Sequence, residues 1–196
     1  DCDSEYYDDD DSSSGYDSGY DTYDNTKEAN PAKILLLDEA SARALVEKSK
    51  GQEIEIELND LVTLSPEIAS ILITHDDNLS LNELADVSDE VADILANHSG
   101  SLSMNGLVRL EHKRLAEKLA PYGDILSFGD IEILSSDAAK AFGKFRGILH
   151  LHELRFLTPE IATSLLAVKG GFILNGLKSV TPEVAEILGR YKSNLS

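Results

Sequence analysis

The residues best placed to do chemistry are two histidines that stand two positions apart, His150 and His152. Side chains two apart on a strand share a face, so this pair could hold a metal ion or move a proton. A zinc site normally needs three or four ligands. The neighbouring rows of the same pattern supply no third ligand, because they carry Ser127, Gly129, Ile173 and Asn175. We therefore interpret the pair as polar surface residues.

Other catalytic signatures are missing from the sequence. No serine stands in a GxSxG context, no glycine-rich loop matches a phosphate cradle, and no carboxylate pair is placed in a cleft. His75, His98 and His112 fall at the expected ends or starts of helices, where we interpret them as solvent-facing or capping residues. We predict no catalytic residue, no metal site and no cofactor, and therefore a protein that is not an enzyme.

The elements that position the histidine pair recur along the chain. An apolar residue returns at spacings of 23, 23, 24, 23 and 23, at Leu58, Leu81, Met104, Phe128, Leu151 and Leu174. Further aliphatic residues follow three and six positions later, and a small residue recurs at Ala69, Ala92, Ala116, Ala139, Ala162 and Ala185. Such a period indicates a solenoid, in which each unit buries its apolar side against the next one.

Each unit reads as a short strand followed by a short helix. The first half alternates apolar and polar residues, which is the period of a half-buried strand. The second half opens on a helix-start signal, a hydroxyl residue followed by proline and glutamate, at 65–67, 158–160 and 181–183. We expect a parallel sheet with one strand per repeat on one side of the chain and the helices on the other.

The pattern LxLNxLxxL(S/T)PE(I/V)AxxL resembles a leucine-rich repeat. It is most similar to the helical, cysteine-containing and ribonuclease-inhibitor-like kind, as divergent 23-residue repeats of bacterial type. The resemblance covers about residues 53 to 196. It implies an α/β solenoid shaped as a horseshoe, with the parallel sheet concave and short helices convex. It also implies a scaffold for protein recognition on the concave face.

On such a sheet, the polar residues between the inward apolar ones point to the concave face. We predict that the partner-binding residues are Glu57, Asn59, Ser80, Asn82, Ser103, Asn105, Ser127, His150, His152 and Asn175. The asparagines have two interpretations. Aligned amides on adjacent strands can hydrogen-bond to one another as a structural ladder, or they can contact the ligand directly.

The two ends of the chain differ from the repeats. Residues 1–30 hold nine Asp, two Glu, one Lys and five of the seven tyrosines, and we predict a disordered acidic tail there. Residues 31–52 align with a repeat at an offset of 27 and predict a partial N-terminal capping repeat. Residues 53–196 hold six copies and the start of a seventh, at 194–196. The chain would then be a fragment, and its uncapped C-terminal edge could support end-to-end self-association.

Composition narrows the partner class. The formal net charge of −19 argues against binding to nucleic acid and favours a basic or mixed-charge protein partner of unknown identity. No apolar run reaches the roughly 20 residues that a membrane-spanning helix needs. The single cysteine, Cys2, excludes an internal disulfide within this piece. No signal segment is visible, so the compartment stays open between cytoplasmic and secreted.

Two functions from different classes follow from these observations. The first is a non-enzymatic scaffold that binds a protein partner on the concave face. The second is a spacer or substrate-positioning arm of a larger enzyme whose catalytic domain lies outside this chain. The full open reading frame would separate them.

Overall fold

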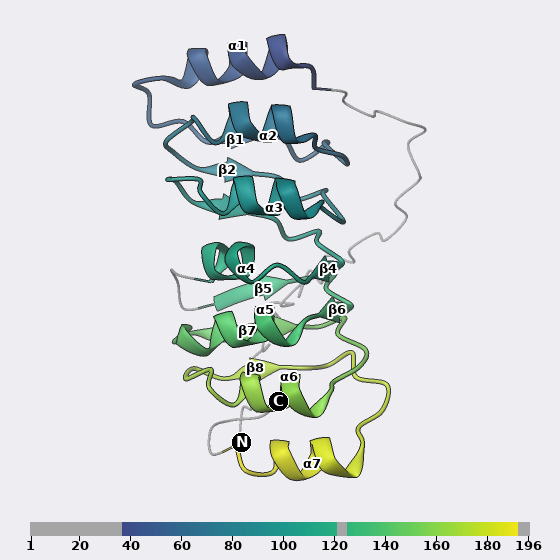
Figure 1. The fold of residues 1–196 in the computed structure, drawn as a ribbon. Coiled ribbons are helices and arrows are strands. Elements are labelled where there is room, and N and C mark those ends of the chain that lie inside the picture. The colour runs from purple at the N-terminus through teal and green to yellow at the C-terminus, as the bar shows by residue number, and fades with distance from the viewer. Residues whose placement is uncertain (1–36, 121–124, 192–196) are drawn as a thin grey trace, which may run out of the picture. The chain divides into compact units, whose positions relative to one another are not determined.

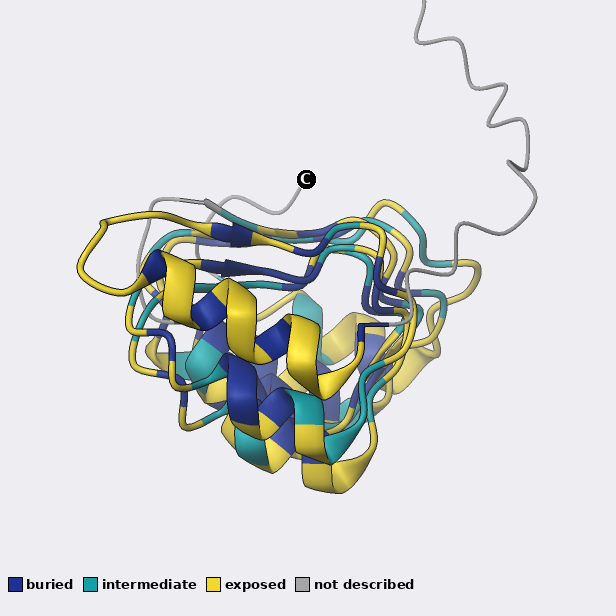
Figure 2. Ribbon diagram, turned by 90° about the horizontal axis from the view of Figure 1, so that it is seen from above, coloured by how far each residue is buried: buried dark blue, intermediate teal, exposed yellow. Residues whose placement is uncertain are grey.

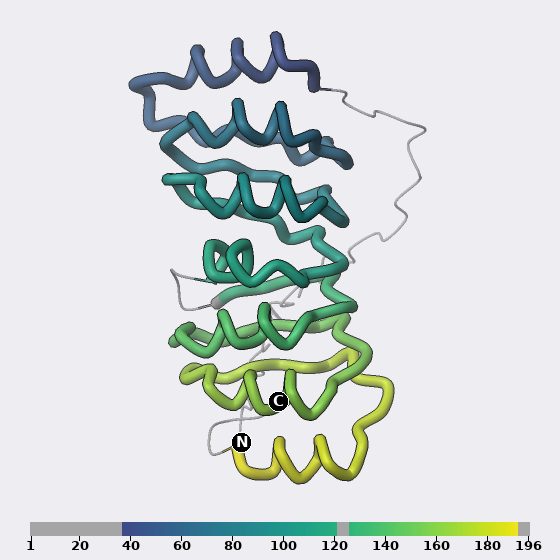
Figure 3. Tube along the Cα trace, viewed as in Figure 1, coloured from purple at the N-terminus to yellow at the C-terminus, as the bar shows by residue number. Residues whose placement is uncertain are grey.

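The computed structural model describes residues 37–120 and 125–191, all within the compact unit Lys33–Ser196. The predicted acidic tail at 1–30 and the predicted seventh strand at 194–196 lie outside the described residues. Figure 1 shows the order of the elements and Figure 3 follows the backbone through them.

Short strands and helices alternate along the chain (Figure 1). Their bounds are α1 Glu39–Ser49, β1 Ile56–Glu57, α2 Pro66–Leu72, β2 Leu79–Ser80, α3 Asp89–Leu95, β3 Leu102–Ser103, β4 Arg109–Leu110 and α4 Lys113–Leu119. Beyond residues 121–124, which are not described, the elements are β5 Ile125–Phe128, β6 Ile133–Leu134, α5 Ser136–Ala141, the 3₁₀ turn η1 Phe142–Lys144, β7 Ile148–Leu151, α6 Pro159–Leu165, β8 Phe172–Ile173 and α7 Pro182–Leu188.

The strands pair in parallel, and their register follows the sequence period. Ile56 on β1 lies opposite Leu79 on β2, which lies opposite Leu102 on β3. In the same way β5, β7 and β8 pair at 23-residue offsets. Within each of these two sheets, every strand therefore pairs with the equivalent strand of the next repeat. Each helix from α1 to α6 packs against the next helix along the chain.

The described strands do not form the single continuous sheet that the sequence predicts. They form two three-stranded sheets, β1-β2-β3 and β5-β7-β8. A separate two-stranded pair joins β4, which precedes α4, to β6, which precedes α5. The break between β3 and β5 coincides with the one 24-residue spacing, between Met104 and Phe128. β4 and β6 nevertheless pair in parallel across this longer spacing, at an offset of 24 residues.

The helix starts that the sequence predicts are confirmed at their N-caps. A hydroxyl of Ser65, Ser88, Ser135, Thr158 or Thr181 accepts the backbone N–H three residues later in each case. Such a cap contributes about 1 kcal/mol relative to alanine. α4 is different, because its N-cap His112 makes no side-chain cap bond.

The core lies between the strands and the helices (Figure 2). In every repeat but the last, the recurring apolar strand residues and helix alanines are buried, and their neighbours include Leu72, Leu95, Phe142 and Leu165, each 0% exposed. Phe128 and Phe142 fill the same layer in the fourth repeat, with ring centroids 5.6 Å apart. In the last repeat Leu174, Leu177 and Leu188 are only half-buried, since no further described turn covers them.

α1 lies at the N-terminal end of the described units. Asp38 caps it by accepting the Ser41 N–H at 2.7 Å. Ala42, Val46 and Ser49 are its buried residues, and α2 packs against it. The assignment of residues 31–52 to a partial capping repeat stays a prediction, since residues 31–36 are not described.

Candidate functional site

The predicted binding residues lie on the strands or directly after them. Pairing sets Glu57, Ser80 and Ser103 side by side on β1, β2 and β3, and Ser127 opposite His150 on β5 and β7. Among the ten residues, Glu57, Asn105, Ser127 and Asn175 are exposed, and Asn59, Asn82, Ser103, His150 and His152 are half-buried. The structure thus brings together two groups, one on β1-β2-β3 and one on β5-β7-β8, and no pairing of described strands joins them.

The first group is a directional hydrogen-bond ladder. Asn59 Oδ1 accepts from the Ser80 hydroxyl at 2.9 Å and from the Asn82 backbone N–H at 3.2 Å. One repeat later, Asn82 Oδ1 accepts from the Ser103 hydroxyl at 2.7 Å and from the Asn105 backbone N–H at 3.0 Å. Asn82 Nδ2 also donates to Ser80 Oγ at 2.8 Å. The same residue types at the same spacing therefore make the same bonds twice.

This geometry corrects the predicted form of the ladder. The amides do not bond to one another; each amide oxygen bonds to the hydroxyl and the backbone N–H of the next strand. The carboxamide oxygen reaches two donors at once there, which uses both of its lone pairs.

The ladder also changes the role expected for Ser80. The Ser80 hydroxyl donates to Asn59 and accepts from Asn82, and the residue is 4% exposed. Ser80 therefore supports the surface from beneath rather than forming it.

The second group is the histidine pair with Asn175. The rings of His150 and His152 meet edge to face with centroids 5.0 Å apart, and His152 Nε2 lies 3.2 Å from His150 Nδ1. Asn175 Nδ2 lies 3.4 Å from His152 Nδ1. An amide N–H only donates, so His152 Nδ1 accepts and its Nε2–H donates to His150. Among the described residues, no group of three or more His, Cys, Asp or Glu side chains could hold a metal ion.

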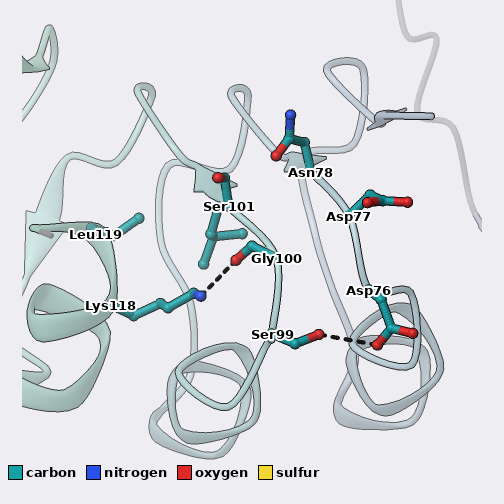
Figure 4. A pocket seen from close by; sticks show the side chains of 9 residues that line it. Asp76, Asp77, Asn78, Ser99, Gly100, Ser101, Lys118 and Leu119 are labelled. Atoms are coloured by element: carbon teal, nitrogen blue, oxygen red, sulfur yellow. Dashed lines mark hydrogen bonds between the residues drawn. The ribbon is translucent and has the colours of Figure 1, made fainter. Parts of the chain in front are cut away.

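Two hollows of the described surface lie away from these groups, at turns that lead from a helix into the next strand. Figure 4 shows one of about 310 Å³, whose lining includes Asp76, Asp77, Ser99 and Lys118. Ser99 Oγ donates to Asp76 Oδ1 at 3.2 Å, and Lys118 Nζ donates to the Gly100 carbonyl at 2.6 Å. Burial lowers the pKa of Lys118. The polar groups that line this hollow therefore include the carboxylates of Asp76 and Asp77 and the amine of Lys118, which already donates to the Gly100 carbonyl.

A second hollow of about 350 Å³ lies at the preceding turn, where Ser49, Glu53 and His75 are among its lining residues. A third, of about 620 Å³, runs between α1 and α2.

The prediction that His75 and His98 face solvent or cap a helix is wrong. Each is 3% exposed and takes part in the core behind these turns. The 23-residue spacing between His75 and His98 could have indicated their burial, because it equals the period at which the core residues recur. His112 does occupy an N-cap position, and its Nδ1 lies 3.4 Å from the carboxylate of Asp89.

Comparison of the chain with protein-family models, curated proteins and solved structures finds no match. No described helix has both the length and the apolar character needed to cross a membrane.

Proposed function

We propose that this chain is a leucine-rich-repeat solenoid that binds a protein partner on its strand face and has no catalytic activity. The observation that carries the proposal is the Asn–Ser ladder, which holds a row of polar side chains in place on adjacent strands. A surface that is ordered before its partner arrives loses less conformational entropy on binding. Repeat proteins commonly use such extended surfaces for recognition.

The exposed members of the row supply the contacts in this proposal. Asn105 and Asn175 are exposed, and the side chain of Asn105 has no hydrogen bond to a described residue. Their amides can donate to and accept from a partner without breaking the ladder. The buried Ser80 and the half-buried Asn82 instead hold the surface in place through their hydrogen bonds.

Charge favours a basic or mixed-charge partner. The formal net charge is −19, and residues 1–30 account for −10 of it (nine Asp and two Glu against one Lys), which leaves −9 for residues 31–196. A positive partner surface is complementary to this charge and would associate faster at low salt.

The test is binding by variants that change the face but not the ladder. Proteins crosslinked to the full chain in cells are identified and purified, and each is titrated against the wild type by calorimetry. Asn105→Arg and Asn175→Arg place a bulky cation on each sheet, and at least one should weaken binding by tenfold or more. Thr163→Arg is the matched control, because Thr163 is exposed on α6 and the change in charge is the same.

Two outcomes would overturn the proposal. One is a partner whose affinity falls with Thr163→Arg and is unchanged by both strand-face variants, which would place the site on the helix side. The other is that none of the purified candidate proteins binds the wild-type chain at micromolar concentration.

A further inference from the structure

Two buried histidines occupy the same position in consecutive repeats. His75 follows α2 and His98 follows α3, and each is 3% exposed. The later described repeats carry Phe145, Val168 and Tyr191 at this position. A histidine there is therefore a core residue that can acquire a charge, in a column otherwise filled by apolar and aromatic side chains.

The hydrogen bonds assign the neutral form of each ring. Ser49 Oγ donates to the Val46 carbonyl at 2.9 Å, so it accepts from His75 Nδ1–H at 3.0 Å. His98 Nε2 lies 2.9 Å from the Asp77 carbonyl, which only accepts, so Nε2 carries the proton. The two rings are thus opposite tautomers, each with one satisfied N–H.

The second nitrogen of each ring has no partner. His75 Nε2 and His98 Nδ1 are buried and have no hydrogen bond to a described residue. Protonation of His98 would turn Nδ1 into a buried, charged N–H, and burying such a group is costly.

The charged groups around the pair do not relieve that cost. Lys118 from α4 and the second histidine repel a charge on His98. The carboxylates of Asp76 and Asp77 in the turn before β2, with Lys50 and Glu53 after α1, line the adjacent hollow, but neither unpartnered nitrogen bonds to them. Burial, the largest cause, lowers the pKa of His98, against the opposing effect of the Asp77 and Ile73 carbonyls.

We propose that protonation of the buried His98, which lies in the same core column as His75, opens the units from α1 to α4, while the units from β5 to α7 stay folded. At the boundary between the two parts, β3 and β5 are not paired among the described strands, while β4 pairs with β6 and α4 packs against α5. Repeat arrays nonetheless open unit by unit, because each unit contacts only its neighbours.

The sign follows from linkage. The folded chain binds protons at His98 less readily than the unfolded chain, so the stability of these units falls as pH drops below about 6.5, the ordinary pKa of histidine. The equilibrium constant between the folded and the opened units changes with pH, because the opened units bind the proton. One histidine that stays neutral in the folded units changes this constant by at most roughly 30-fold between pH 7.5 and 5.0.

The experiment compares the full chain with a double variant, His75→Asn and His98→Gln. Asn Nδ2 replaces the donor at Nδ1 and Gln Nε2 replaces the donor at Nε2, and neither side chain can be protonated. Hydrogen exchange at pH 7.5 and 5.0, corrected for intrinsic rates, should show protection of 66–119 falling about tenfold or more in the wild type and far less in the variant. Protection of 136–188 should change little. His150→Gln with His152→Gln is the control and should keep the wild-type pH dependence.

Equal pH dependence in the wild type and the His75→Asn, His98→Gln variant would overturn the proposal, as would an equal loss of protection in both halves. Should the variant fail to fold, ¹⁵N-labelled wild type decides the question. Long-range ¹H–¹⁵N spectra should show a protonated Nδ1 on one buried ring and a protonated Nε2 on the other at pH 7.5. A charged His98 ring at pH 5.0 in a chain that remains folded would refute it.

Discussion

Replacing Asn82 tests whether the ladder on β1-β2-β3 stabilises the fold. Asn82→Ala removes three hydrogen bonds, to Ser80 Oγ, Ser103 Oγ and the Asn105 backbone N–H. A neutral hydrogen bond contributes about 1 kcal/mol net, which gives about 3 kcal/mol for three. Asn82 is half-buried, so water can replace part of this, and we expect a loss of about 2 kcal/mol. For a chain of this size that corresponds to a thermal midpoint lower by about 4–8 °C.

The matched control is Asn105→Ala. Its side chain is exposed and makes no hydrogen bond to a described residue, so the same truncation should change the free energy of unfolding by no more than about 0.5 kcal/mol. Thermal and urea unfolding followed by far-ultraviolet circular dichroism measure both variants. A loss at Asn105 that equals or exceeds the loss at Asn82 would refute the reasoning, because the ladder would then not distinguish the two asparagines.

Two further changes probe the repeat geometry. A Cβ atom on Gly100 would lie 1.9 Å from the Asp77 carbonyl oxygen of the preceding turn, whereas one on Gly129 meets no atom within 4 Å. Gly100→Ala should therefore lower the thermal midpoint by several degrees, and Gly129→Ala should not. Equal midpoints for the two variants would exclude the close approach at Gly100. His112→Ser should supply the missing cap acceptor for α4 and raise the free energy of unfolding by about 0.5–1 kcal/mol. An unchanged or lower urea midpoint would show that the exposed contact to Asp89 matters more than the cap.

The period of the sequence predicted local structure well. The hydroxyl residues at the helix starts are N-caps, as at Ser65 and Thr158, because a cap depends only on residues within one turn. The identification of the chain as a leucine-rich repeat remains a proposal.

The candidate site was predicted in outline only. The columns of strand residues follow from alternation, but their bonds depend on the offset between strands. The Asn82 oxygen meets Ser103, 21 residues later, and not the equivalent Asn105 side chain 23 residues later. Exposure likewise depends on neighbours from other repeats, which is why Ser80 is covered although it alternates like an outward residue.

The sequence by itself determined the repeat length, the starts of most helices and the side chains that alternate inward, because these features depend on spacing within a short segment. The tertiary structure alone decided where the sheet is interrupted, which amide oxygens are used up, and that His75 and His98 are buried. Each of these depends on the distance between atoms in different repeats, and that distance is set by how one turn packs on the next.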